Sequence, residues 1–241
     1  MQDHEEPGAF TRATGRAVEQ SSQQPRYRRY QFSLIAPHCG LSVLEIGSGQ
    51  GDFAAQFTGL QRLVLTDVDP AAVRLLKVRF AGRPEVEVRE FDLDAELQPH
   101  GPVDSVVAIN VLEHLEDDAA ALRALNALVR PGGSIILWVP AYPALYGDFD
   151  HKVGHYRRYT PDALSAVVKT AGLTVERCHP VNFLGGLAWW LAVRLGGTGS
   201  PRPRLVALYD RFVVPVTRAI ERWRPPPFGQ SVLCVARTAR G

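Results

Sequence analysis

Residues 42–53 read SVLEIGSGQGDF, and the rest of the chain can be arranged around this stretch. An apolar run ends at Ile46, three glycines follow at alternate positions, and residues 52–57 suit a helix. The pattern predicts a strand, a tight turn and a helix. Glycine permits a positive φ in the turn, and its missing side chain lets a ligand lie against the backbone at the end of a parallel strand. The stretch therefore predicts a ligand-binding turn in an α/β protein.

A second apolar strand, residues 63–66, leads to Asp67, which lies eighteen residues beyond Gly49. An acidic residue at this position can accept hydrogen bonds from both hydroxyls of a ribose. The spacing G-x-G-x-G departs from the dinucleotide pattern G-x-G-x-x-G. Glu45, at the strand end, would repel a pyrophosphate and suits an ammonium group. No G-K-[ST] follows, so a phosphate cradle is disfavoured, and the pattern indicates a nucleoside with an ammonium group.

Residues 43–51 resemble the first motif of the class I S-adenosylmethionine (SAM) methyltransferases. The family's later motifs are matched in order by TDVDP at 66–70, FDL at 91–93, VDSVVAINVLEHL at 103–115 and RPGG at 130–133. The resemblance runs from about residue 42 to 173 and again over the last strand. It implies an α/β fold: a Rossmann-like, seven-stranded, doubly wound sheet whose last strand is antiparallel. It also implies SAM as cofactor and S-adenosylhomocysteine (SAH) as product.

The resemblance assigns cofactor contacts to the ends of the first four strands. It implies that Gly47, Ser48 and Gly49 line the methionine moiety and that Glu45 fixes their loop. Asp67 is expected to hold the ribose, and Asp92 with Leu93 the adenine. The full predicted set is Glu45, Gly47, Ser48, Gly49, Phe53, Asp67, Val68, Asp92, Leu93, Asn110 and Val111.

Length and composition favour one domain of moderate charge. The chain has 241 residues and a net charge of +2, without a long run of one sign, so nucleic acid is not an expected partner. Three widely spaced cysteines fit a reducing compartment. The N-terminus lacks the apolar core of a signal peptide, and no apolar run reaches about 18 residues, so we expect a cytoplasmic protein without a spanning helix. Residues 1–24 are predicted to be flexible, and 25–241 to form the domain, with 184–226 as a helical insert.

Other elements follow from periodicity and capping. Strands are predicted over residues 85–91, 103–110, 134–139, 173–182 and 229–238. Helices are predicted over 70–80, 119–129 and 160–171, with Asp69 and Thr160 as N-caps. A further helix over 25–35 places Tyr27 and Tyr30 on one face. Two interpretations of it stay open: the tyrosines pack on the domain, or the helix closes over the cofactor.

Residues 140–159 are the densest polar and aromatic stretch, about 20 residues without regular periodicity. They follow the fifth strand on the ligand side of the sheet, so we predict that they bind the acceptor. The chain resembles a bacterial methyltransferase branch, of type 11/12 character, with an acidic residue and Gly-His-x-Arg-Arg-Tyr here. The predicted substrate-binding set, including the N-terminal helix, is Tyr27, Tyr30, Tyr142, Tyr146, Tyr156, Arg157, Arg158 and Tyr159.

Histidine supplies the candidate catalytic groups. His155 and His151 are candidates to take the acceptor's proton, because imidazole titrates near neutral pH. His114, near the end of the fourth strand, is a candidate for shaping the transfer site. The alternative is that the loop side chains only hold the loop in place. No metal site is predicted: Gly154 breaks the helical spacing that a set of Asp148, Asp150, His151 and His155 would need.

The insert has an apolar segment over 183–195, with Trp189 and Trp190, and then an amphipathic helix. Pro215 is expected to kink that helix. Its predicted apolar stripe is Leu205, Leu208, Tyr209, Phe212, Val213, Val216, Ile220 and Trp223, with Asp210, Arg211, Arg218, Glu221 and Arg222 opposite. One interpretation packs the insert on the sheet or on a second subunit in a homodimer. The other makes it a lid or a peripheral membrane contact over residues 184–224.

These features together predict a SAM-dependent methyltransferase that methylates O, N or C of a small, lipophilic or ring-bearing acceptor, in natural-product or lipid biosynthesis. The chain's small charge argues against RNA or DNA as acceptor. Two other classes remain: a catalytically silent SAM-binding module and an NAD-dependent oxidoreductase.

Overall fold

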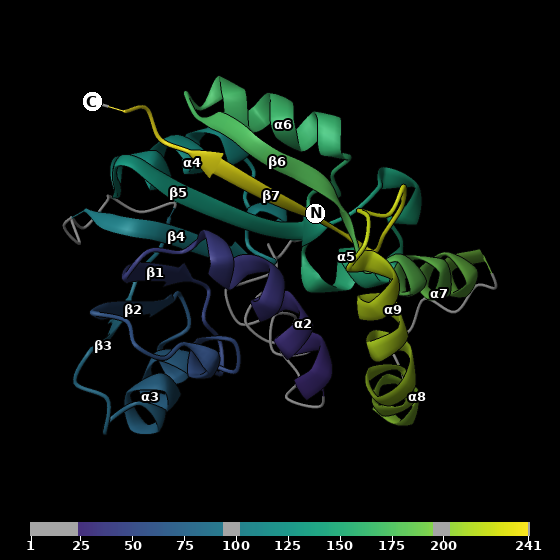
Figure 1. The fold of residues 1–241 in the computed structure, drawn as a ribbon, viewed down its shortest axis with the longest axis horizontal. Coiled ribbons are helices and arrows are strands. Elements are labelled where there is room, and N and C mark those ends of the chain that lie inside the picture. Colours follow the sequence, from purple (N-terminus) through teal and green to yellow (C-terminus); the bar gives the residue numbers. More distant parts are fainter. Residues whose placement is uncertain (1–23, 94–101, 195–202, 241) are drawn as a thin grey trace, which may run out of the picture.

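The structure is a computed structural model, and it describes residues 24–93, 102–194 and 203–240. Its centre is a seven-stranded sheet with the order β3-β2-β1-β4-β5-β7-β6 (Figure 1). The predicted flexible segment, residues 1–24, falls almost wholly outside the described residues. The predicted Rossmann-like, doubly wound sheet is confirmed.

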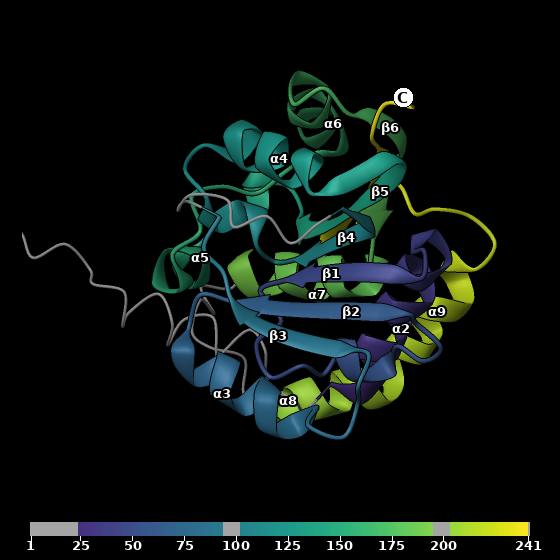
Figure 2. The same ribbon diagram turned by 90° about the vertical axis from the view of Figure 1, so that its left-hand side faces the viewer.

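The strands keep the predicted order and directions. Strands β1 to β5 are parallel, and β7 is antiparallel to both β5 and β6. Their bounds are β1 Ser42–Ile46, β2 Arg62–Asp67, β3 Val86–Glu90, β4 Val103–Ile109, β5 Val129–Pro140, β6 Thr174–Val181 and β7 Ser231–Arg237. The carboxyl ends of β1, β2 and β4 therefore meet at one edge, where α/β sheets bind ligands (Figure 2).

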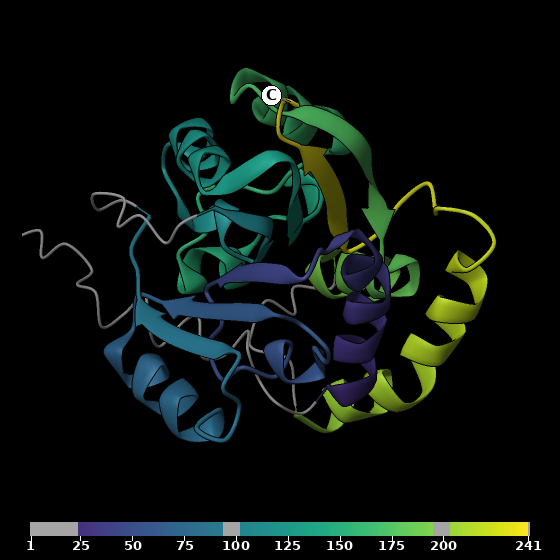
Figure 3. The same cartoon turned by 60° about the vertical axis from the view of Figure 1, so that its left-hand side comes forward.

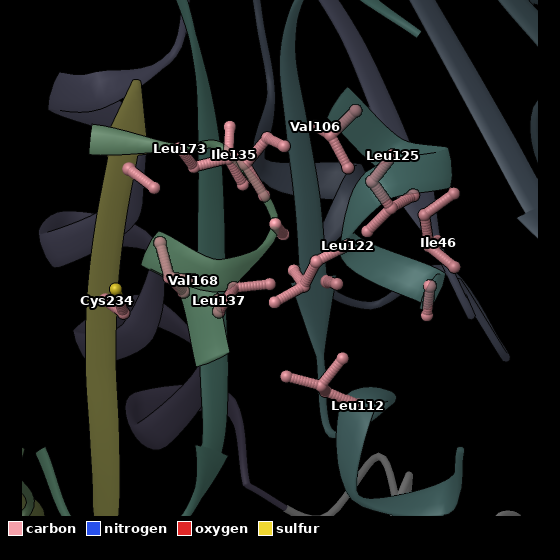
Figure 4. Packing of buried hydrophobic residues seen from close by; sticks show 14 of the residues in the cluster. Ile46, Val106, Leu112, Leu122, Leu125, Ile135, Leu137, Val168, Leu173 and Cys234 are labelled. Atoms are coloured by element: carbon pink, nitrogen blue, oxygen red, sulfur yellow. The ribbon is translucent and has the colours of Figure 1, made fainter. Parts of the chain in front are cut away.

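Helices cover both faces of the sheet. On one face, α4 (Asp118–Ala127) packs on β5 and α6 (Pro161–Thr170) packs on β6 and β7; Figure 4 shows Leu125 near Val106 and Val168 near Leu137. On the other face lie α2 (Pro25–Ile35), α3 (Pro70–Arg79) and α9 (Val214–Glu221). Alternate residues of β5 enter the two cores, as the period of two along a strand requires.

The predicted N-caps are present. The side chain of Asp69 accepts a hydrogen bond from the backbone N–H of Ala71, and that of Thr160 accepts one from Ala163. Each cap precedes a proline at the start of its helix, a position where the missing N–H costs nothing. Local chemistry therefore fixes where α3 and α6 begin.

Two predicted helical segments were wrong. The helix expected over residues 52–57 is a single 3₁₀ turn, Ala54–Gln56, because Phe57 is extended and packs edge-on against Phe32. The helix expected to continue to Val129 ends at Ala127, and β5 begins at Val129. Residues 130–133, which include Pro131 and Gly132, form an irregularity inside β5, where the pairing with β4 shifts register.

The insert contains α7 (Phe183–Arg194), α8 (Pro203–Leu208), a π-helical turn (Tyr209–Val213) and α9. The distortion expected at Pro215 appears as this π turn. Proline cannot donate to the carbonyl four residues earlier, and that carbonyl, of Arg211, accepts a bond from Nη1 of Arg26 at 2.7 Å. The π turn and α9 run beside α2 (Figure 3). Among the described helices, none is long and apolar enough to cross a membrane.

Helices α8 and α9 pack on the domain, but not through their predicted apolar stripe; packing on a second subunit stays a prediction. Asp210, Val214 and Thr217 form the buried side of this helical segment. The predicted apolar stripe faces outward; its exposed members are Leu205, Leu208, Phe212, Val216, Ile220 and Trp223. The insert therefore packs on the domain through an acidic and small face, not through its apolar stripe.

Candidate cofactor and acceptor site

The turn after β1 adopts the conformation that its glycines predict. Gly47, Gly49 and Gly51 have φ values of 69°, 53° and 77°. A Cβ atom on Gly47 would lie 2.9 Å from Cγ2 of Val111, and one on Gly51 would lie 2.6 Å from the ring of Phe80. Conformation and close packing both exclude larger residues. The turn therefore requires glycine at positions 47 and 51.

Asp67, at the end of β2, is bonded to the same turn. Its Oδ2 accepts a hydrogen bond from the backbone N–H of Gly49 at 2.8 Å, and Oδ1 accepts one from Asp69 at 3.0 Å. The backbone N–H of Ser48 donates to Thr66 O at 2.8 Å. An ionised carboxylate offers about four acceptor sites, so Asp67 retains capacity for a ligand hydroxyl.

A pocket opens between the glycine turn, the end of β4 and helix α2. Its empty space, which includes open solvent, is about 450 Å³. It is lined by Arg28, Glu45, Gly47, Ser48, Gln50, Asp52, Phe53, Ile109 and Asn110. Five predicted cofactor residues thus lie in one pocket: Glu45, Gly47, Ser48, Phe53 and Asn110. Val111 packs beside Gly47, Leu93 packs against the core, and Val68 and Asp92 are exposed after β2 and β3.

Glu45 is the unusual charge of this pocket. Its carboxyl group is buried, and burial raises its pKa to about 8; the charge of Arg28 opposes this shift and that of Asp67 adds to it. Its Oε2 atom accepts no hydrogen bond from the described residues. A buried carboxylate without a donor is costly. A ligand with a positively charged donor would supply what Glu45 lacks, as the sequence predicted for an ammonium group.

Arg28 was missed by the sequence analysis. The interpretation in which α2 closes over the cofactor placed this helix near the pocket, but only the packing of α2 on the sheet brings Arg28 opposite Glu45. The one available signal in the sequence was the position of Arg28 between Tyr27 and Tyr30 in the predicted helix.

The loop after β5 is tied together by Asp150. This buried carboxylate accepts hydrogen bonds from Nδ1 of His155 at 2.7 Å, from Nε of Arg158 at 2.8 Å and from the backbone of Gly147 at 3.0 Å. Burial raises the pKa of Asp150, but the bonds from His155 and Arg158 outweigh it and hold the pKa below its usual value. The guanidinium of Arg158 also lies 5.2 Å from the ring of Trp189 in α7.

The other two motif residues bond to the start of α4. The hydroxyl of Tyr159 donates to Oδ2 of Asp118 at 2.8 Å, and Nη1 of Arg157 pairs with the same oxygen at 2.9 Å. Burial and the charge of Asp118 raise the pKa of Tyr159. Arg157, Arg158 and Tyr159 thus have roles in holding the loop, while substrate contact by them stays a prediction.

The structure brings two predicted catalytic histidines together. The rings of His114 and His155 are buried, with centroids 4.7 Å apart, and Nε2 of His155 lies 3.9 Å from Oε1 of Glu113. His151 is exposed and packs edge-on against Tyr146, whose hydroxyl donates to the carbonyl of His155 at 2.5 Å. Glu113 was not predicted, although it precedes His114 within the motif after β4.

Comparison with known proteins identifies the family to which the chain belongs. A family model described as a methyltransferase domain matches residues 10–177. The chain belongs to this methyltransferase family. A probable S-adenosylmethionine-dependent methyltransferase of Mycolicibacterium smegmatis is 32% identical over 178 residues, 71% of this chain and 68% of that protein.

Two further similarities extend the comparison. A ubiquinone biosynthesis O-methyltransferase of Paracidovorax citrulli is 33% identical over 105 residues, 41% of this chain and 43% of that protein. The crystal structure of the trans-methyltransferase CalH with SAH has a TM-score of 0.56 at 22% identity, over 87% of this chain and 55% of that chain. This methyltransferase spans about half the length of several other mycobacterial relatives.

SAM is the cofactor of this methyltransferase, and the pocket fits it. The buried Glu45 oxygen without a donor suits the ammonium group of its methionine moiety. The positive φ of Gly47 and Gly49 exposes backbone for close approach. The assignments of Asp67 to the ribose and of Asp92 and Leu93 to the adenine stay predictions.

The predicted acceptor tyrosines fall into different environments. Tyr27 and Tyr30 pack edge-on against Trp138, at 6.2 and 6.0 Å between ring centroids. Tyr30 is buried, and its hydroxyl bonds to Glu221 of α9, as the packing interpretation of α2 expects. Tyr142 stacks on Phe228 at 4.8 Å, whereas Tyr156 is exposed. Acceptor binding by these tyrosines stays a prediction.

Proposed function

We propose that this methyltransferase transfers the methyl group of SAM to O, N or C of a small, lipophilic or ring-bearing acceptor that it meets at an anionic membrane surface. The observation that carries the proposal is the outward apolar face of α8 and α9. We define this face as the insert face, with the members Leu205, Leu208, Phe212, Val216, Ile220 and Trp223.

The residues of the pocket have separate proposed roles in binding SAM. When bound, SAM supplies a methyl group already activated by its sulfonium, so the protein mainly aligns donor and acceptor and excludes water. The carboxyl of Glu45 would bind the ammonium group, and the turn at Gly47 and Gly49 would lie along the methionine moiety. Asp67 would accept bonds from the ribose, and Asp92 and Leu93 would contact the adenine.

The size of the insert face supports a binding role. Its six side chains are 49–83% exposed, and Leu187, Trp190 and Leu191 of α7 are 39–51% exposed. Single exposed apolar residues are common, but a set this large on neighbouring helices is typical of an interaction surface. Helices α7 and α9 contact each other, so the two sets belong to the same part of the molecule.

Hydrogen bonds on the inner side fix this orientation. Asp210 accepts bonds from the backbone N–H groups of Arg26 and Tyr27, at 3.2 and 2.8 Å, and so caps the start of α2. Glu221 accepts one from Phe183 at 2.7 Å, at the start of α7. Rotating the segment to bury the insert face would break these bonds, so exposure is a stable property of the fold.

Charge favours an anionic membrane as the occupant. The segment over 203–224 exposes Arg204, Arg211, Arg218, Arg222 and Arg224. Its two acids, Asp210 and Glu221, are engaged on the inner side. An apolar helical face flanked by arginine suits an interface with anionic lipid, where each basic residue near the surface contributes about 1 kcal/mol. The aromatic side chain of Trp223 suits the headgroup region.

Similarity to the Paracidovorax citrulli protein, named for an O-methyltransferase of ubiquinone biosynthesis, supports a ring-bearing lipophilic acceptor. The aromatic loop after β5 is the proposed acceptor side. A homodimer through the insert face, a silent SAM-binding module and an NAD-dependent oxidoreductase are the competing outcomes of the tests below.

Flotation with vesicles tests the membrane contact. We expect the full chain to float with vesicles of phosphatidylcholine and phosphatidylglycerol and to stay behind with phosphatidylcholine alone. Phe212→Glu with Trp223→Glu should abolish flotation. Val78→Glu on α3 is the matched control. Val78 is 78% exposed on another face, so this substitution should leave flotation unchanged. Failure to float, or a stable dimer in solution that the double variant dissociates, would overturn this part.

Methyl transfer is tested with SAM labelled in its methyl group and a cell extract, separated into organic, aqueous and acid-precipitable fractions. Label in the organic fraction that depends on the protein, and that is absent with Asp67→Ala, is expected. Label in the precipitate would contradict a small acceptor. SAH binding without transfer would favour the silent module, and tighter binding of NAD than of SAH would favour the oxidoreductase.

A further inference from the structure

Glu113, His114 and His155 form a compact buried cluster at the carboxyl end of β4. One ligand-capable atom from each, a carboxylate oxygen or a ring nitrogen, lies within 4.8 Å of the others. Glu113 and His114 belong to the short 3₁₀ turn Leu112–His114, and His155 comes from the loop after α5 (Asp148–Val153). Residues 41 or more positions apart in the chain are thus brought to one point by the sheet.

The hydrogen bond to Asp150 fixes the tautomer of His155. An ionised carboxylate can only accept, so Nδ1–H of His155 donates to Oδ1 of Asp150 at 2.7 Å. Nε2 of His155 lies on the side of Glu113, 3.9 Å from its Oε1. Arg158 holds Asp150 in turn. A carboxylate behind a histidine is the usual support of a metal-binding imidazole.

The spacing is close to what one ion requires. Nitrogen and oxygen ligands lie about 2.0–2.2 Å from Zn²⁺, so two ligand atoms of a tetrahedral ion lie about 3.3–3.6 Å apart. Nε2 of His155 and Oε1 of Glu113 lie 3.9 Å apart, and the three ligand atoms all lie within 4.8 Å of one another, so a bound ion would draw them together by about 1 Å.

We propose that Glu113, His114 and His155 bind one divalent transition-metal ion of the Zn²⁺, Co²⁺ or Ni²⁺ class. Two imidazoles and a carboxylate match the preferences of these ions. Three protein ligands leave at least one coordination position open, as in catalytic rather than structural metal sites. These three ligands differ from the set considered from the sequence, which lay wholly within residues 148–155. Only His155 belongs to both sets.

The position of the cluster gives the ion a role. Asn110, three residues before Glu113, lines the cofactor pocket, and His155 belongs to the proposed acceptor loop. An ion here would bind an acceptor oxygen and lower the pKa of its hydroxyl. This role rests on the proposed function and narrows the acceptor to a hydroxyl compound.

In the transfer of the methyl group to the hydroxyl, one bond forms and one breaks at the methyl carbon. The hydroxyl proton leaves to water, an oxygen lone pair forms the new O–C bond, and the C–S bond breaks with its electron pair going to sulfur. The sulfonium becomes a neutral thioether, and one proton is released for each methyl group transferred.

The test measures metal binding directly. The full chain is stripped with a chelator and titrated with ZnCl₂ in a calorimeter, and with CoCl₂ while visible absorption is recorded. We expect one equivalent to bind, with the Co²⁺ spectrum of a low-symmetry nitrogen and oxygen site. Glu113→Gln and His114→Gln should each weaken Zn²⁺ binding by about a hundredfold or more. No binding, or binding that these variants leave unchanged, would overturn the proposal.

Two controls separate the outcomes. His151→Ala removes an exposed histidine of the same loop and should leave Zn²⁺ affinity unchanged; a loss there would favour the sequence-based ligand set and contradict ours. SAH binding by the stripped chain and by both ligand variants reports on the fold and on the cofactor pocket. SAH binding without metal binding overturns the metal site alone, whereas metal binding without SAH binding overturns the proposed function instead.

Discussion

The carboxylate of Asp67 accepts a hydrogen bond from the backbone N–H of Gly49 at 2.8 Å, across 18 residues of sequence. The bond joins the end of β2 to the glycine turn after β1. The second oxygen accepts the N–H of Asp69. The residue predicted to hold the ribose therefore also shapes the turn that is predicted to hold the methionine moiety.

Asp67→Asn should weaken SAH binding by about 10- to 100-fold, because hydrogen bonds to a charged group contribute about 1.5–3 kcal/mol and an amide cannot accept from both N–H groups. Isothermal titration calorimetry measures the loss. Asp69→Asn keeps an N-cap on α3 and should leave the affinity unchanged. Equal losses in both variants would contradict a specific role for Asp67.

The affinity for SAH should rise with pH between 6 and 8. The pKa of Glu45 is raised to about 8, so its carboxyl is largely protonated in the free protein below that pH. An ammonium group favours the carboxylate, so binding releases a proton, and the dissociation constant should fall by up to about tenfold per pH unit until pH 8. Glu45→Gln should flatten this profile. A pH-independent affinity in the unaltered chain would contradict the assignment.

The stability of the ligand-free protein should change in the opposite sense. Because the folded pKa of Glu45 lies above its unfolded value, the folded state binds more protons between about pH 4.5 and 8. This contribution to stability is complete below pH 4.5 and is lost as pH rises through 8. The free energy of unfolding of Glu45→Gln, measured with urea, should therefore increase relative to that of the unaltered chain as pH rises.

Arg158→Ala should destabilise the fold by about 3–5 kcal/mol, the usual cost of removing one partner of a buried ion pair. Its partner Asp150 is buried, and the contact with Trp189 is lost as well. Arg157→Ala is the matched comparison: its pair with Asp118 is partly exposed, so the cost should stay near or below about 1 kcal/mol. Denaturant unfolding followed by circular dichroism distinguishes the two.

Glu221→Ala should destabilise the fold by about 1–3 kcal/mol, because the hydroxyl of buried Tyr30 and the N–H of half-buried Phe183 lose their acceptor. Phe212→Ser, on the exposed side of the same helical segment, should change the free energy of unfolding by less than about 0.5 kcal/mol. A large loss with Phe212→Ser would show that the insert face is buried in solution, for instance in a dimer.

Much of the fold could be predicted because its signals are local. Asp69 and Thr160 start helices by binding nearby N–H groups, and Gly47, Gly49 and Gly51 mark a turn that needs positive φ. The helix expected over residues 52–57 failed because Phe57 gains more by packing on Phe32 than by continuing a short helix. Propensity is weak over one or two turns, and tertiary contact overrides it.

The candidate site likewise contains residues that could be predicted from the sequence and residues that could not. Glu45 could be placed at the ligand from its position beside the glycines. Arg28 and Glu113 could not, because their relevance depends on the packing of α2 on the sheet and on the path of the loop that carries His155.

By itself, the sequence determined the order of strands and helices, the glycine turn with its acidic partner, and membership of the methyltransferase family, because each depends on spacing along the chain. Only the tertiary structure decided that the apolar stripe of the insert faces outward and that Glu113, His114 and His155 meet. Periodicity gives a helix two faces but not which one is buried. Asp210 and Glu221 settle that choice by capping helices that lie far away in sequence.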